Sequence, residues 1–275
     1  MLPRIVAKIR RSLGLPEIER YKMRRFLKAH KSLPPINKNQ TEKLSLTLIV
    51  TCFKHEAYLD KCFESILNQT RKPDEIIFMN NRSPDNTREK INGFIQKYGK
   101  TINLKLINNE RNLGQAGSLN AGINISKSKY IMILNDDDYL FPEAVETMLE
   151  QFKKNPELAM IGANTISFTK DSEITKVLNT SRSNASEKLT IHTPDQVRNY
   201  KNYDDISMTH SGSVFVKSVW AQVGGFYSNR LKRMVPFSDR DFQLRVGLLY
   251  PIGVLIERPL SFWRSDSSVD SGINS

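Results

Sequence analysis

Residues 46–70 read LTLIVTCFKHEAYLDKCFESILNQT, and this stretch decides the fold class. Its first six residues form a short apolar run, as in a buried β-strand, and residues 58–68 have the periodicity of an amphipathic helix. The polar segment 51–56 comes between the strand and the helix. The stretch therefore predicts a strand, a loop with polar side chains and a helix, in that order.

The same alternation continues to residue 134. Further strands are expected at residues 75–79, 104–107 and 130–134, and further helices at 87–98 and 115–126. Strands separated by amphipathic helices favour right-handed βαβ units. We therefore predict an α/β fold with a mainly parallel, Rossmann-like sheet flanked by helices. Ligands of such sheets bind beyond the carboxyl ends of the strands.

Three polar clusters follow predicted strands directly. They are residues 51–56 (TCFKHE), 80–85 (NNRSPD) and 135–138 (NDDD). Because the strands are parallel, all three clusters are expected at one edge of the sheet.

The acidic run 135–138 is the sharpest signal among them. Carboxylates crowded at a strand end repel one another unless a cation neutralises them, and such hard oxygen ligands suit Mg²⁺ or Mn²⁺. The alternative is a solvated turn in which an aspartate caps the following helix. The position after the fourth strand favours the metal site.

Composition limits the class of protein. Of the 275 residues, 39% are hydrophobic and 25% charged, so disorder of the whole chain is not expected. The two cysteines, Cys52 and Cys62, fit a reducing compartment and lack metal-ligand spacing. No apolar stretch is long enough for a transmembrane helix, and cations interrupt any signal-peptide core, so we expect a cytoplasmic protein.

The net charge of +12 is concentrated near the N-terminus. Residues 1–44 contain twelve Lys and Arg against three Glu. Residues 2–13 carry an apolar stripe between cations, and a second basic helical stretch is expected at 17–31. We interpret residues 1–31 as a contact with an anionic membrane surface, which places the protein at the inner face of the cell membrane. The alternative is a pair of solvated helices packed on the body, or a mobile tail.

Several motifs together resemble the family 2 glycosyltransferases. They are the stretch 46–70, then IIFMNNRSPDNT (76–87), NNERNLGQAGSLNAGI (108–123), YIMILNDDDYLFP (130–142), VGGF (223–226) and SDRDFQLR (238–245). Each motif alone is weak, but all occur in the family's order across residues 46–270. The resemblance implies a GT-A fold. It divides the chain into the basic extension 1–44, a nucleotide-sugar-binding half 45–150, and an acceptor-binding half with the catalytic base, 151–275.

On the donor side, the family's Asp-X-Asp motif falls on Asn135, Asp136 and Asp137. The resemblance implies that Asp137 coordinates Mn²⁺ or Mg²⁺ on the donor diphosphate. Asp266, in the place of a family histidine, is implied as a second ligand. The family's paired aspartates after the second strand are asparagines here. The implied donor-binding residues are Thr51, Phe53, Glu56, Asn80, Asn81, Arg82, Asn112, Gly114, Asn120, Asn135 and Asp136.

On the acceptor side, the family's Glu-Asp motif falls on Ser238 and Asp239. Asp239 is therefore the implied catalytic base of an inverting transfer, with Asp241 in reserve. His210 and Gly212 are expected to line the acceptor site.

The implied activity is transfer of a sugar from a nucleotide-diphosphate sugar to a glycan or lipid-linked acceptor, in surface polysaccharide synthesis. Three alternatives remain at this stage. A basic nucleic-acid-binding protein has no recognition motif in its support. The second is a nucleotide-sugar pyrophosphorylase, but such enzymes have a glycine-rich loop after the first strand, and residues 51–56 of this chain contain no glycine. A degenerate, inactive nucleotide-sugar fold that binds membrane or nucleic acid is the third.

Overall fold

The computed structural model describes residues 17–31, 36, 43–180, 188–200, 206 and 208–266. Its strands are β1 (Leu46–Cys52), β2 (Glu75–Asn80), β3 (Leu104–Asn108), β4 (Tyr130–Asn135), β5 (Tyr139–Leu140), β6 (Met160–Phe168), β7 (Leu189–His192), β8 (Val214–Val216) and β9 (Ile252–Arg264). The helices are α2 (Glu17–Ala29), α3 (Leu59–Leu67), α4 (Thr87–Tyr98), α5 (Gly114–Ile125), α6 (Ala144–Lys154), α7 (Asp171–Thr180), α8 (Pro194–Arg198), α9 (Lys217–Gln222), the 3₁₀ turn η2 (Arg230–Lys232) and α10 (Ser238–Leu249).

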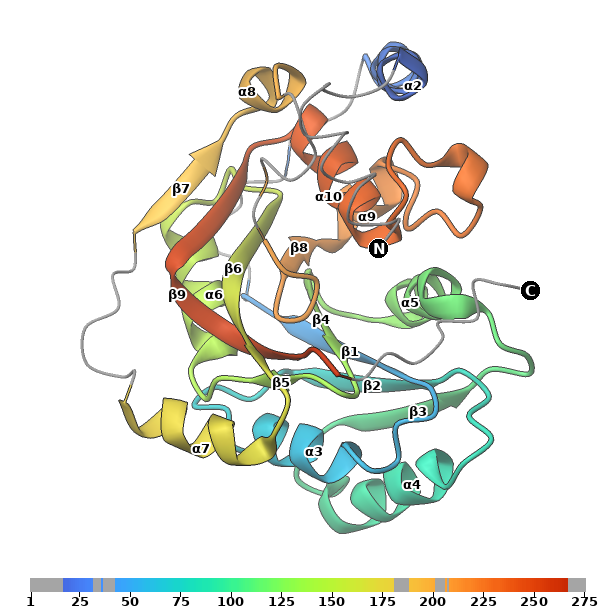
Figure 1. Ribbon diagram of the computed structural model, residues 1–275, viewed down its shortest axis with the longest axis vertical. Coiled ribbons are helices and arrows are strands. Elements are labelled where there is room, and N and C mark those ends of the chain that lie inside the picture. Colours follow the sequence, from blue (N-terminus) through green and yellow to red (C-terminus); the bar gives the residue numbers. More distant parts are fainter. Residues whose placement is uncertain are drawn as a thin grey trace.

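One sheet runs through the body, in the order β3-β2-β1-β4-β8-β6-β9-β5, with β7 paired to β9. β3, β2, β1 and β4 are parallel. The chain steps outward from β1 to β2 and β3, then returns to place β4 on the other side of β1. Because both kinds of crossover keep one hand, α3 and α4 cover one face and α5 the opposite face (Figure 1). The order therefore reverses between β1 and β4, which is where such sheets bind ligands.

The predicted α/β fold is confirmed. Each of the four predicted strands continues one residue further, to Cys52, Asn80, Asn108 and Asn135. These polar residues stay in the ladder because each has a partner on the neighbouring strand; Asn135, for example, pairs with Thr51. The polar edge of the sheet is thus held by the same backbone hydrogen bonds as its core.

The core explains the uninterrupted apolar runs. Every residue of β1 and β2 is buried, as expected for parallel strands covered on both faces. β3 lies at the edge and is half-buried. Helix α3 packs one side of its surface into the hydrophobic core, through Leu59, Cys62, Phe63 and Ile66.

The two halves inferred from sequence share this sheet. β8 pairs antiparallel with β4, and β9 pairs antiparallel with β5. The boundary inferred between the two halves, at residue 150, lies within α6. Residues 151–275 therefore continue the sheet of residues 45–150.

In the N-terminal extension, α2 confirms the second predicted helix, whereas residues 2–13 lie outside the described residues. α2 packs on the body through Met23 and Phe26, both 8% exposed. Among the helices that the structure describes, none has the length and apolar character needed to cross a membrane.

Candidate active site

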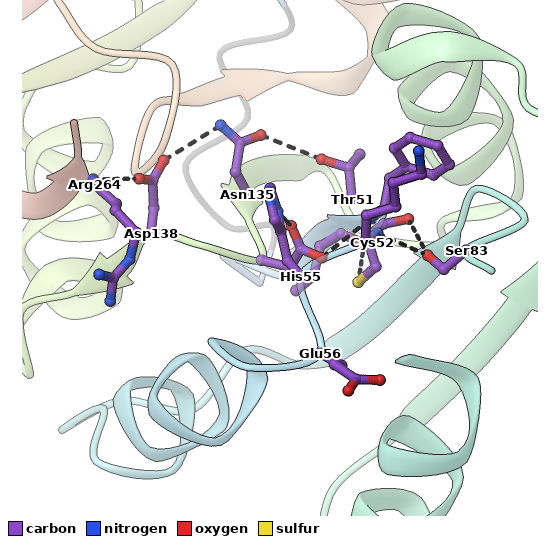
Figure 2. Close-up of polar contacts among 12 residues, drawn as sticks. Thr51, Cys52, His55, Glu56, Ser83, Asn135, Asp138 and Arg264 are labelled. Atoms are coloured by element: carbon purple, nitrogen blue, oxygen red, sulfur yellow. Dashed lines mark hydrogen bonds and ion pairs between the residues drawn. The ribbon is translucent and has the colours of Figure 1, made fainter. Parts of the chain in front are cut away.

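The ends of β1 and β4 meet at the reversal of strand order. Thr51 and Asn135 lie opposite each other in the ladder, and the Thr51 hydroxyl donates a 3.2 Å hydrogen bond to Asn135 Oδ1. The loop after β1 and the acidic run after β4 therefore lie side by side, as Figure 2 shows, in the position of the ligand-binding crevice of such sheets. The sequence prediction that these clusters share an edge is confirmed.

Three side chains here form a group suited to a divalent cation. One ligand atom from each of His55, Asp136 and Asp137 lies within 4.8 Å of the others. His55 Nδ1 is 2.7 Å from Asp136 Oδ1, and the Phe53 amide donates to Asp136 Oδ2 at 3.1 Å. His55 Nε2 is buried and has no hydrogen-bond partner among the described residues. The two carboxylates and the imidazole are side chains that can hold a divalent cation, and the buried Nε2 is left unpartnered within the described part of the chain.

The electrostatics of this group favour an added positive charge. Burial raises the pKa of Asp136 to about 6, although the hydrogen bond and charge of His55 oppose the rise. Burial and the neighbouring Asp137 charge raise the pKa of Asp138 to about 7. Burial alone would lower the pKa of His55, but its hydrogen bond to Asp136 and the three carboxylates raise it. A cation in the crevice would stabilise the ionised carboxylates and relieve their repulsion.

The structure explains why asparagine stands at position 135. Asn135 Oδ1 accepts from Thr51 and from Gln115 Nε2, at 2.8 Å, while Asn135 Nδ2 donates to Asp138 Oδ2 at 3.3 Å. An aspartate at position 135 would set a second carboxylate against Asp138. The amide instead joins β1, α5 and the acidic run.

Asp138 is more buried than His55, Asp136 and Asp137, and it ties these three residues to β9. Its carboxylate accepts from the Ser211 hydroxyl at 2.5 Å and from the Arg264 amide at 3.0 Å. The Arg264 guanidinium donates to Tyr139 Oη at 2.7 Å and stacks over Tyr58, 4.1 Å from the ring centroid.

Asp266, the expected second metal ligand, is half exposed and lies 3.8 Å from Arg264 Nη1. It is not in the ligand group identified among the described residues, where His55 is the third member. His55 lies in the polar segment 51–56, but its proximity to Asp136, 81 positions later, is a property of the strand order.

An asparagine network occupies the ends of β2 and β3. Asn80 Nδ2 donates to Asn108 Oδ1 at 2.8 Å. Asn81 Nδ2 donates to Asn112 Oδ1 at 2.6 Å, and Asn81 Oδ1 accepts from Asn109 and from the Leu113 amide. Asparagine both donates and accepts here, which aspartate cannot do when ionised. The network fixes the loop that begins α5.

The other expected donor contacts have varied surroundings. Glu56 accepts from the Asn86 amide at the start of α4, and Figure 2 shows its carboxylate directed away from the acidic run. Arg82 donates to the Glu110 carbonyl at 3.1 Å. Gly114 has φ +65° at the first position of α5, with open space around it. Asn120 bridges instead to Trp220 Nε1 and to the backbone of Phe226.

Asp239, the expected catalytic base, is half-buried in the first turn of α10. Its charge acts on His210, although burial dominates and lowers the His210 pKa. His210 Nε2 is buried without a hydrogen-bond partner among the described residues. Gly212 has φ +84°, and its amide donates to the Ile133 carbonyl of β4 at 2.8 Å.

Asp241 has a different environment from Asp239. It is fully buried in an ion pair with Arg245, at 2.8 Å, and also accepts from the Met234 amide at 2.6 Å. Arg245 donates further to the carbonyls of Val223 and Gly225. This pair fixes the segment that precedes α10. Because the Asp241 carboxylate is buried in the pair, Asp239 is the more accessible of the two carboxylates.

Comparison with known proteins agrees with this geometry. A family model described as glycosyl transferase family 2 matches residues 47–219. A chondroitin synthase of Pasteurella multocida is 34% identical over 133 residues, which are 48% of this chain and 13% of that protein. A poly-beta-1,6-N-acetyl-D-glucosamine synthase of Staphylococcus epidermidis is 31% identical over 119 residues, 43% of this chain and 28% of that protein. The matches therefore span a minor part of these relatives.

Two solved structures share the fold. S. aureus TarS 1-349, in complex with UDP-GlcNAc, has a TM-score of 0.61 at 14% identity over 84% of this chain and 61% of that one. The mannosyltransferase PcManGT of Pyrobaculum calidifontis, in complex with GDP-Man and Mn²⁺, has a TM-score of 0.56 at 15% identity over 90% and 64%.

Proposed function

Because this chain belongs to glycosyl transferase family 2, we propose that it transfers a sugar from a nucleoside diphosphate sugar to a glycan or lipid-linked acceptor, with inversion and with a divalent cation. The observation that carries the proposal is the group formed by His55, Asp136 and Asp137 where the strand order reverses. The pairing of a polar crevice with a separate accessible carboxylate, Asp239, supports the two roles that such a transfer needs.

On the donor side, Asp137, Asp136 and His55 would hold Mn²⁺ or Mg²⁺, which neutralises charge on the leaving diphosphate. Asp136 is already oriented by the Phe53 amide. The first turn of α5 starts at Gly114, whose amide donates to Asn112 Oδ1, and the amides that follow it would offer hydrogen bonds to phosphate oxygens. The hydrogen bond from the Thr51 hydroxyl to Asn135 joins the ends of β1 and β4.

On the acceptor side, Asp239 would take the proton of the acceptor hydroxyl while that oxygen bonds to the anomeric carbon. The bond from that carbon to the diphosphate breaks on the opposite side of the sugar, so the product has the inverted configuration. The charge of Asp239 acts on His210, which would orient the acceptor.

The curated relatives support a role in polysaccharide synthesis, since their names describe synthases of chondroitin and of poly-N-acetylglucosamine. The complexes of the solved structures support UDP-sugars first and GDP-sugars second. The positive charge of residues 1–44 supports attachment at the inner face of the cell membrane.

A nucleotide panel tests the proposal. The thermal midpoint of the full chain is measured with UDP, GDP, dTDP and CDP, each with Mn²⁺ and with a chelator. Ligands that bind only the folded state raise the midpoint. We expect one diphosphate to stabilise the protein strongly and only with Mn²⁺. No stabilisation by any of the four would contradict the proposal.

A further inference from the structure

The loop between α9 and α10 displays apolar side chains to solvent. Leu231, in η2, is 82% exposed, and Phe237, directly before α10, is 58% exposed. Leu231 stands between Arg230 and Lys232, both exposed. An aliphatic side chain at the tip of a basic turn is well placed for contact with a partner that is apolar inside and anionic outside.

The loop that carries Leu231 is held by hydrogen bonds among its own residues. The Arg233 guanidinium donates to the carbonyls of Tyr227 at 2.6 Å, Ser228 at 3.0 Å and Pro236 at 2.9 Å. Asn229 Oδ1 accepts from the Leu231 amide at 2.9 Å. Arg233 thus closes the loop from within, which holds Leu231 outward.

Helix α2 extends the same surface. Lys22 Nζ donates to the Arg233 carbonyl at 2.8 Å and so joins α2 to the loop. With Met23 and Phe26 buried against the body, α2 exposes Arg24, Arg25 and Lys28, and Tyr21 is 63% exposed. Helix α2 and residues 227–237 contain eight Lys and Arg against two acidic residues, Glu17 and Glu19. This surface therefore carries a net positive charge.

We propose that this surface, made of α2 and residues 227–237, docks on an anionic lipid bilayer. Leu231 and Phe237 enter the boundary between headgroups and acyl chains, while the cations contact lipid phosphates. The exposed aliphatic Leu231 between cations favours lipid over nucleic acid. A bilayer has an apolar layer beneath its phosphates, whereas nucleic acid has none. Since Asp239 follows Phe237 by two residues, docking holds this carboxylate close to the membrane.

Vesicle binding tests this surface with a matched control. The full chain, Leu231→Glu and Ile256→Glu are sedimented with vesicles of phosphatidylcholine alone and with 30% phosphatidylglycerol. Ile256 is also an exposed aliphatic residue, at 48%, but it lies on β9, outside the proposed surface. Both variants add one negative charge, so their difference reports the position of the side chain.

We expect Leu231→Glu to weaken binding to the anionic vesicles about tenfold or more, and Ile256→Glu to change it less than twofold. We expect weak binding of all three proteins to phosphatidylcholine alone. Equal binding by the two variants would overturn the proposal, since residues outside this surface would then make the contact. Loss of binding to single-stranded DNA by Leu231→Glu, with vesicle binding unchanged, would also overturn it.

Discussion

Replacement of Arg245 by methionine removes the cation from the most deeply buried ion pair among the described residues. Arg245 and Asp241 are both fully buried, and the guanidinium also donates to the carbonyls of Val223 and Gly225. It stacks over Tyr227 at 3.9 Å as well. In the variant, the Asp241 carboxylate loses this partner in a site that water does not reach.

The expected loss of stability follows from this burial. Removal of one partner from a buried ion pair costs about 3–5 kcal/mol, because the remaining charge is uncompensated. A domain of this size loses roughly 2–4 °C of thermal midpoint per kcal/mol, so we expect a fall of roughly 6–20 °C. An exposed pair serves as control: Lys61→Met removes the partner of Glu64, whose side chain is 55% exposed, and should cost at most about 1 kcal/mol.

Differential scanning calorimetry and urea unfolding of the two variants measure these costs. The double variant Asp241→Leu with Arg245→Met should recover part of the loss, since it leaves no buried charge. A thermal midpoint of Arg245→Met within 2 °C of the parent would refute the reasoning. The reasoning would also be refuted if the double variant lost as much stability as Asp241→Leu alone and Arg245→Met alone added together, because the two residues would then not be coupled.

Three further predictions follow from the site. Asp239→Asn should lower kcat by at least about 100-fold with donor affinity nearly unchanged, and steady-state kinetics with donor binding would decide between this and a structural role. Asn81→Asp should reduce the free energy of unfolding by about 1–3 kcal/mol in urea, because a carboxylate would meet Asn112 Oδ1 where an amide now donates. Cys52 and Cys62 should resist a thiol reagent until the protein unfolds, because burial raises both pKa values; rapid labelling of the native protein would contradict this.

Much of the fold was accessible from sequence because the parallel strands are apolar on both faces. The run from Ile131 to Leu134 and the polar residues after it marked both a buried strand and the edge that carries the site. The interpretation of Asp136 and Asp137 as site residues rested on the same pattern. The structure adds that their side chains lie with His55 in one group.

The partners of the asparagines were not accessible in this way. Asn81 was interpreted as a donor-binding residue from its place in the family resemblance, whereas its hydrogen bonds go to Asn109, Asn112 and Leu113, about 30 residues away. Such contacts depend on how a loop returns over the sheet edge, and no local periodicity encodes that path. The same holds for Asn120, whose partners lie 100 and 106 positions later.

Metal binding in the presence of nucleotide tests the central claim most directly. Mn²⁺ is titrated into the full chain with the diphosphate selected by the nucleotide panel, and the electron paramagnetic resonance signal of free Mn²⁺ is followed. We predict that the parent protein removes one equivalent of free Mn²⁺, and that Asp137→Ala weakens this binding at least about tenfold while the thermal midpoint without ligand stays the same. Equal Mn²⁺ affinity of the parent and Asp137→Ala would contradict the assignment of the crevice as the metal and diphosphate site.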